Sequence, residues 1–128
     1  MSSKWSANVK LCRNKIVGKM GEDMGAEYLK TNGFRVLERN FRTRFGEIDI
    51  VAQKGREYFF VEVKTRTQTD FGSSLESLPF FRINRLKKMA LFYVQKKKIP
   101  DSFMHLSLLG IDGSGVQQQI TFLPDIVE

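Results

Sequence analysis

The hydrophobic positions of the chain change between a helical and a strand-like period. Four apolar residues near the N-terminus recur at helical spacing, namely Val17, Met20, Met24 and Tyr28. Gly33 then supplies a helix stop. Later runs rich in phenylalanine, valine and isoleucine have the period of strands. The pattern predicts a helix over Lys15–Asn32, strands over Phe34–Phe41, Phe45–Ala52 and Glu57–Lys64, a helix over Arg82–Lys97, and strands over Phe103–Ile111 and Gln118–Leu123.

This order of elements, αβββαββ, predicts a single α/β domain built in layers. The chain has 128 residues, a length that suits one hydrophobic core. It contains neither internal repeats nor a linker that would divide it. Residues 1–13 are polar and lack periodicity, so we expect a flexible basic tail there and one domain over residues 14–128.

The first predicted helix contains three glycines, Gly18, Gly21 and Gly25. Each costs a helix about 1 kcal/mol relative to alanine. We therefore expect the helix backbone to lie close against a flat surface. Glu22 shares the face of Gly18 and Gly25, so its carboxylate should point toward the packed side.

Composition excludes several classes of site. One cysteine, Cys12, rules out an intramolecular disulfide and a cysteine-based zinc cluster, and one histidine, His105, rules out a multi-histidine metal site. No apolar run approaches the roughly 20 residues of a membrane span, and residues 1–15 lack the apolar core of a secretory signal. We expect a protein of a reducing compartment, most simply the cytoplasm, without a membrane partner.

The charge of the chain is unevenly distributed. Lysine and arginine number 21 against 14 aspartates and glutamates, which gives a formal net charge of +7. The excess lies in two acid-free blocks, residues 1–21 and 77–100, whereas carboxylates crowd around residues 22–27 and 47–62. Basic blocks beside an acidic centre favour a polyanion held near a cation site. The alternative is a solvated surface that only keeps the protein soluble.

The predicted hairpin over residues 45–64 places carboxylates where a strand pair disfavours them. With a two- or four-residue turn, opposed residues have numbers that add up to 111, so Asp49 faces Glu62. By the same rule Glu47 faces Lys64. Directly opposed Cβ atoms lie about 4.5 to 5.5 Å apart, and like charges at that separation repel.

A divalent cation would reverse the sign of this repulsion. Oxygen ligands without histidine or cysteine favour Mg²⁺ or Mn²⁺, so the hairpin predicts a site for a hard metal ion. The alternative is an exposed hairpin face on which Glu47 and Lys64 form a salt bridge. That alternative leaves the opposition of Asp49 and Glu62 unexplained.

Asp49, followed across a hairpin by Glu62-Val63-Lys64, resembles the PD-(D/E)xK nuclease signature. From about Gly18 to Val94 the chain is similar to the YraN-like family, a bacterial branch related to archaeal Holliday-junction resolvases. The similar segments are Gly21-Glu22, Arg39-Asn40-Phe41-Arg42, Gly46-Glu47-Ile48-Asp49-Ile50-Val51, Val61-Glu62-Val63-Lys64-Thr65-Arg66 and Phe71-Gly72. The chain departs from the pattern at Ile48, where the signature has proline, and at Arg82, where the family has lysine.

The resemblance implies a restriction-endonuclease-like fold, a central mixed β-sheet flanked by helices, and hydrolysis of DNA phosphodiesters. It implies that Asp49, Glu62 and the Val63 carbonyl hold Mg²⁺, with Mn²⁺ as a substitute. Lys64 would orient the attacking water or stabilise developing charge. Glu22 would complete the catalytic cluster, directly or through a water.

The DNA partner implied by the resemblance is branched or duplex DNA, bound without sequence preference, in repair or recombination. The candidate phosphate contacts are Arg42, Arg66, Arg82, Arg85 and Lys88. Phe71 is a weaker candidate for stacking on a base. Two coordinated incisions in a junction would need two active sites, hence a homodimer. The alternatives are a non-catalytic nucleic-acid-binding protein on a nuclease scaffold and a module whose basic helix binds an acidic protein.

Overall fold

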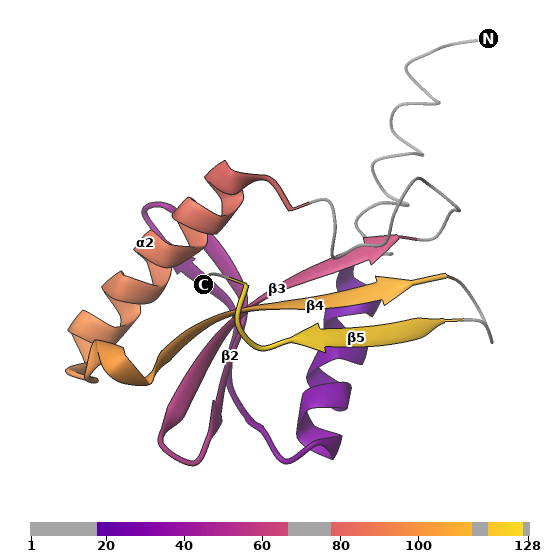
Figure 1. Ribbon diagram of the computed structural model, residues 1–128, viewed down its shortest axis with the longest axis horizontal. Helices are drawn as coiled ribbons and strands as arrows, with labels where there is room; N and C mark the ends of the chain where they lie inside the picture. Colours follow the sequence, from indigo (N-terminus) through magenta and orange to yellow (C-terminus); the bar gives the residue numbers. More distant parts are fainter. Residues whose placement is uncertain (1–17, 67–77, 114–117, 127–128) are drawn as a thin grey trace, which may run out of the picture.

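The computed structural model describes residues 18–66, 78–113 and 118–126, and it shows a five-stranded sheet flanked by helices (Figure 1). The first helix is described over residues 18–31. The later elements are β1 (Arg35–Thr43), β2 (Gly46–Lys54), β3 (Glu57–Arg66), α2 (Phe80–Lys97), the short 3₁₀ helix η2 (Asp101–Phe103), β4 (Met104–Asp112) and β5 (Gln119–Leu123). The predicted α/β class and element order are confirmed, and the predicted tail over residues 1–13 lies outside the described residues.

The sheet is mixed, as the family resemblance implies. The strand order is β1-β2-β3-β4-β5, and every neighbouring pair is antiparallel except β3 with β4. A parallel pair needs a crossover connection, and α2 lies in the segment that joins β3 to β4. The connection from β3 to β4 therefore places α2 on one face of the sheet.

Each face of the sheet has its own hydrophobic core, because successive side chains of a strand point to opposite faces. On one face Ile48 and Phe60 pack with Leu86 and Tyr93 of α2. On the other face the sheet packs against the first helix, in a core formed by Ala26, Leu29, Ile50, Ala52, Phe59, Val61, Leu109 and Ile111. The central strands are thus buried on both sides, and a polar residue among them needs a specific partner.

Two of the three helix glycines lie against the sheet, as their positions predict. A Cβ atom at Gly21 would overlap the Thr65 side chain of β3, and one at Gly25 would lie 3.3 Å from Leu109 of β4. At Gly18 a Cβ atom would meet nothing within 4 Å. The close approach at Gly21 brings the following residue, Glu22, to the edge of the sheet.

Helix α2 begins two residues earlier than its hydrophobic period predicts. Pro79 takes an extended conformation at the N-cap, with φ of −72° and ψ of 154°, and Phe80 opens the helix. The period misses this turn because Phe80 and Phe81 are 74% and 65% exposed and so add nothing to the buried stripe. Within the helix, Met89 is buried and Ile83 is only half-buried.

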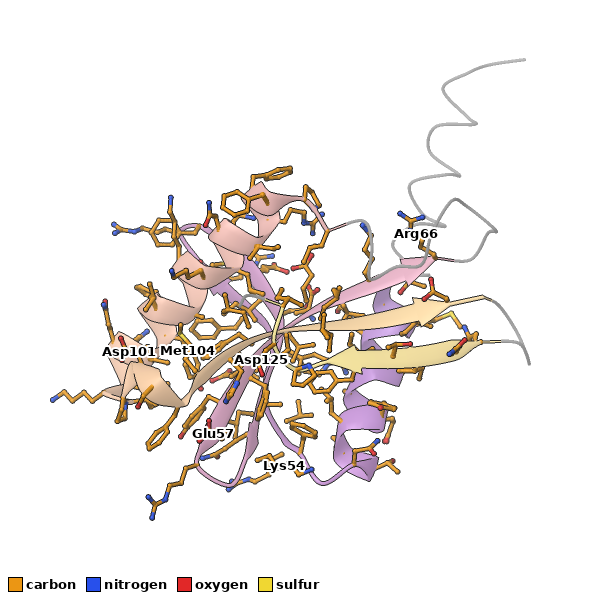
Figure 2. The ribbon with its side chains drawn as sticks, in the orientation of Figure 1. Lys54, Glu57, Arg66, Asp101, Met104 and Asp125 are labelled. Carbon is orange, nitrogen blue, oxygen red and sulfur yellow. The ribbon has the colours of Figure 1, made fainter. Side chains whose placement is uncertain are left out.

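The imidazole ring of His105 contacts two carboxylates. Its Nε2 lies 2.5 Å from Glu57 Oε1, and its Nδ1 lies 2.6 Å from Asp125 Oδ1. The carboxylates come from distant parts of the chain, Glu57 at the start of β3 and Asp125 after β5 (Figure 2). The ring also stacks on Phe59, with the ring centroids 4.6 Å apart. These contacts give His105 a structural role.

The His105 contacts predict a pH-dependent stability. Burial lowers the pKa of His105, but its hydrogen bonds to Asp125 and Glu57 outweigh burial and raise the pKa above the ordinary value of 6.5. Stabilisation from the charged imidazole is therefore complete below the unfolded pKa and is lost as pH rises through the folded pKa.

We expect His105→Gln to lower the free energy of unfolding by about 1 kcal/mol near pH 5.5 and by clearly less near pH 8.5. Urea denaturation of both proteins at the two pH values measures the difference. An equal loss at both values would show that protonation of this histidine does not contribute to stability.

Candidate active site

The β2–β3 ladder stops at the predicted carboxylates. Its pairs run from Lys54–Glu57 to Ile50–Val61, which confirms the predicted register. At the next position the Val63 N–H donates to the Asp49 side chain, with 2.8 Å between Val63 N and Asp49 Oδ2. Beyond this point β2 remains paired with β1, near α2, while β3 continues alongside β4 (Figure 1). Asp49 therefore stands where the two strands part.

The strand separation corrects the pairing predicted at this end of the hairpin. Asp49 and Glu62 are not partners in the ladder, although their carboxylates lie close enough to interact. Glu47 does not face Lys64 across the ladder, because the paired part of β2 and β3 ends at Ile50 and Val61. Glu47 is instead opposite Arg42 of β1, whose Nε donates to Glu47 Oε2 at 2.9 Å. The simple register rule assumes an uninterrupted ladder, and a side chain that takes a main-chain donor interrupts it.

The surroundings of Asp49 disfavour the ionised form of its carboxyl group. Burial raises its pKa most, and the nearby Glu62 carboxylate raises it further. The Val63 hydrogen bond acts in the opposite sense, and the net effect is a pKa of about 7 instead of 3.8. Asp49 is thus close to half-protonated at neutral pH, which is uncommon for a carboxyl group and typical of functional sites.

Glu62 is the most deeply buried charged residue that the structure describes, with 12% of its side chain exposed. The Arg82 guanidinium, from the first turn of α2, donates to Glu62 Oε2 through Nη2. The Nε of Arg82 is also buried, and it has no hydrogen-bond partner among the described residues. Arg82, predicted to contact DNA, therefore lies within the carboxylate site itself.

Lys64 lies two residues after Glu62 on β3, so both side chains lie on the same face of the strand. Burial lowers its pKa, and so do the nearby Arg66 and Arg82 cations, whereas Glu62 raises it. The net direction is downward. Lys64 is therefore easier to deprotonate than a solvated lysine while it remains beside the carboxylate.

Glu22 reaches the site from the first helix. Burial raises its pKa, although a hydrogen bond from the Asn40 side chain and the charge of Arg39 oppose the rise. The Glu22 charge also contributes to the raised pKa of Asp49, which shows that the two carboxyls interact. The structure thus brings Asp49, Glu62, Lys64 and Glu22 into one electrostatic cluster.

Asn40 is a positioning residue that the sequence analysis quoted in a motif without assigning it a role. Its φ is 54°, in the left-handed region, although it lies within β1. It stands between the paired residues Arg39 and Phe41, whose partners Ile50 and Ile48 flank Asp49. Asparagine tolerates this conformation better than other non-glycine residues. An asparagine inside an otherwise regular strand was the available signal.

The donor set fits a hard divalent cation only in part. Asp49 and Glu62 offer carboxylate oxygens beside the Val63 main chain, the chemistry that Mg²⁺ prefers. In the part of the chain that the structure describes, no three acidic, histidine or cysteine side chains converge closely enough to hold a metal ion. Both roles predicted for Glu22, direct or through a water, stay predictions.

The remaining predicted DNA contacts flank the site on two sides. Arg85, Lys88 and Arg42 are exposed, and a Cβ atom at Gly46 in the β1–β2 hairpin would lie 3.7 Å from the Arg85 side chain. Hairpin and helix cations thus form one surface. Arg66 lies at the C-terminal end of β3 (Figure 2), and Phe71 lies outside the described residues. No helix among the described segments is long and apolar enough to cross a membrane.

Comparisons with known proteins identify relatives of this chain. The model of "Uncharacterised protein family UPF0102" matches residues 21–111. A UPF0102 protein of Dictyoglomus turgidum is 48% identical over 98 residues, which cover 77% of this chain and 83% of the relative. A UPF0102 protein of Geobacter metallireducens is 38% identical over 115 residues, which cover 90% and 94%.

Two solved structures show a weaker likeness. One is Archaeoglobus fulgidus Hjc, a Holliday junction resolvase, with 18% identity, a TM-score of 0.49, and coverage of 80% of this chain and 72% of that one. The other is Pyrococcus furiosus SfsA in complex with Ca²⁺, with 16% identity, a TM-score of 0.40, and coverage of 87% and 63%. With TM-scores this low, neither likeness carries an inference about this chain.

The family match contains the whole candidate site, from Glu22 on the first helix through Asp49 and Glu62 to Arg82 on α2. The two relatives also align over most of their own lengths. The sequence resemblance is therefore confirmed: this chain belongs to the UPF0102 family, the YraN-like family to which its motifs point.

Proposed function

We propose that this protein is a divalent-metal-dependent deoxyribonuclease that hydrolyses phosphodiester bonds at the Asp49, Glu62 and Lys64 cluster. One observation carries the proposal. Two carboxylates of neighbouring strands are held together near the core, where burial first and then the charge of Glu62 raise the pKa of Asp49 to about 7. Such an arrangement is unfavourable for folding alone, and a bound cation would make it favourable.

Asp49, Glu62 and the Val63 carbonyl are the residues that would hold Mg²⁺ or Mn²⁺. When bound, the ion supplies Lewis-acid polarisation of the scissile phosphate and of the attacking water. Lys64 would then hold the water by a hydrogen bond or stabilise charge that develops on the phosphate. Asn40 fixes Glu22 at the edge of this cluster, where its carboxylate can act through a water.

Cations beside the cluster would bind the DNA backbone. Helix α2 contains six lysines and arginines and no acidic residue, and Arg42 extends the surface onto β1. Contacts of this kind position a nucleic acid without reading its sequence. Branched DNA of repair or recombination is the substrate class we propose, and a homodimer would supply the two active sites that paired incisions need.

A second candidate function is DNA binding without cleavage. The ion pair between Arg82 and Glu62 favours it, because the guanidinium already neutralises a proposed metal ligand. In that case the only role of the carboxylates is to position the cations that contact DNA. The two functions predict the same affinity for DNA and differ in chemistry.

Incubation with labelled duplex, flap, junction and single-stranded DNA tests the proposal. Each substrate is tested with Mg²⁺, with Mn²⁺ and with EDTA. Metal-dependent cleavage of at least one substrate supports the nuclease. Binding of DNA without cleavage of any substrate would leave the second candidate.

Asp49→Asn should stabilise the metal-free protein at neutral pH. Because folding raises the pKa of Asp49 from 3.8 to about 7, its contribution favours folding at acidic pH and is lost between about pH 4 and 7. Asparagine does not ionise, so we expect it to raise the free energy of unfolding by about 2 to 4 kcal/mol near pH 8. Urea denaturation across this pH range measures the effect, with Asp101→Asn on the exposed η2 as the control.

The same pair of proteins tests metal binding. Mg²⁺ at a hundredfold excess over Kd should stabilise the wild type by about 2.7 kcal/mol and should not stabilise Asp49→Asn. An equal metal-induced shift in both proteins would exclude Asp49 as a ligand.

Glu62→Gln and Lys64→Ala should separate chemistry from binding. We expect each to reduce the cleavage rate by about 10² to 10³, because each removes a group that acts on the reacting phosphate. DNA affinity in EDTA should change by less than about threefold, since backbone cations supply most of it. Glu27→Gln and Lys30→Ala, which are exposed on the first helix, are matched controls purified in parallel. Full activity in Glu62→Gln would contradict the proposed site.

Arg85→Gln with Lys88→Gln should weaken DNA binding regardless of sequence. If both side chains contact phosphates, the slope of log K against log salt should fall by about 0.9 per lost contact. Lys96→Gln with Lys97→Gln removes the same charge from the last turn of α2 and is the matched control. Equal losses in the two double variants would show a net-charge effect in place of a defined binding surface.

A further inference from the structure

The first turn of α2 presents two exposed aromatic rings beside the candidate active site. Phe80 and Phe81 are the most exposed of the large hydrophobic side chains that the structure describes. Arg82 follows them directly in the same turn and reaches the Glu62 carboxylate. The rings therefore lie in the same helical turn as Arg82, the residue that contacts a proposed metal ligand.

Exposed lysine and arginine side chains of α2 lie next to the two rings along the helix. Residues three and four positions apart share one face of a helix, so two exposed stripes run along α2. One consists of Phe81, Arg85 and Lys88, and the other of Phe80, Asn84 and Lys87. Each stripe has an aromatic ring at the end near the carboxylates and a cation farther along the helix. The surface thus fits a partner that is flat and apolar at one end and anionic at the other.

We propose that Phe80 and Phe81 stack on unpaired bases of DNA while the cations behind them hold its phosphates. This inference rests on the proposed function and narrows its substrate. The bases of a continuous duplex are already stacked on one another and offer no free face to the rings. The preferred substrate is therefore DNA with unstacked bases next to the cleaved phosphate, as in a junction, a flap or a single-stranded end.

A second copy of the chain fits this surface poorly. A twofold contact through Phe80 and Phe81 would bring the same patch of both copies together. It would also gather Arg85, Lys87 and Lys88 of both copies around one contact, and α2 has no acidic residue to pair with them. Like charges in such a contact are unfavourable. Nucleic acid, by contrast, supplies both the flat apolar groups and the negative charge.

Fluorescence anisotropy in EDTA tests the proposal without cleavage. The probes are a duplex and a duplex of equal length with a central unpaired tract, titrated with wild type, Phe80→Ala/Phe81→Ala and Phe80→Leu/Phe81→Leu. We expect both double variants to lose about tenfold in affinity for the unpaired probe, because leucine keeps the apolar contact but not the flat ring. Affinity for the duplex should change by less than about twofold. Leu123→Ala, which truncates an exposed apolar residue of β5, should leave both affinities unchanged.

Photocrosslinking supplies a positional readout. DNA with 5-iodouracil in the unpaired tract should crosslink to Phe80 or Phe81, as mapped by mass spectrometry of the digested complex. Sedimentation and thermal melting of the same proteins test whether a second copy of the chain, or the protein's own fold, covers the two rings. A dimer that dissociates in the alanine variant, or a large fall in its melting temperature, would overturn the proposal by showing that the rings cover protein.

Base stacking and nuclease activity are overturned by different results. Equal affinity of the wild type for both probes, or a preference that survives the loss of both rings, would overturn the stacking and leave the nuclease proposal standing. Failure of the wild type to bind either probe would overturn both.

Discussion

The hydrogen bond from the Val63 N–H to the Asp49 carboxylate is the contact on which the site depends. A buried main-chain N–H must have an acceptor, and along an unbroken ladder β2 would supply a carbonyl. Here the side chain takes that donor, and the paired part of the two strands ends. β2 can then remain with β1 near α2 while β3 continues with β4. Residues of helices on both faces of the sheet interact with the carboxylates at this fork, Glu22 from the first helix and Arg82 from α2.

The charge balance at the fork explains how such a site can fold. Three carboxyls interact there, which in a buried setting would destabilise the native state. Arg82 neutralises part of the charge on Glu62, and the pKa of Asp49 near 7 means that a proton neutralises part of its own. A divalent cation bound there as proposed would supply the charge compensation that the proton and the guanidinium now give. Metal binding would therefore be linked to proton release and to the position of the first turn of α2.

Sequence analysis could predict what depends on local periodicity and short connections. The element order and the β2–β3 register followed from alternation and from one short turn, and the glycines of the first helix indicated their close approach to the sheet. The pairing of Glu47 with Lys64 could not be corrected from sequence, because it required knowing that Asp49 interrupts the ladder. The Arg82–Glu62 contact was also inaccessible, since 20 residues separate the partners and the crossover geometry alone brings them together. Phe80 and Phe81 could not be assigned to the helix from sequence, because only the buried residues of a helix show its hydrophobic period.

The first turn of α2 is less constrained by packing than the later turns of this helix. In this chain the first turn of α2 lies beside β3, because Arg82 in that turn contacts Glu62. The later turns are constrained, because Leu86, Met89, Ala90 and Tyr93 fill the core under the sheet. Phe80 and Phe81 bear no such constraint, since they are exposed, and only Arg82 among the first three residues contacts the carboxylates. Folding therefore supplies no reason for two exposed aromatic rings at these positions, which is what the proposed contact with unpaired bases would explain.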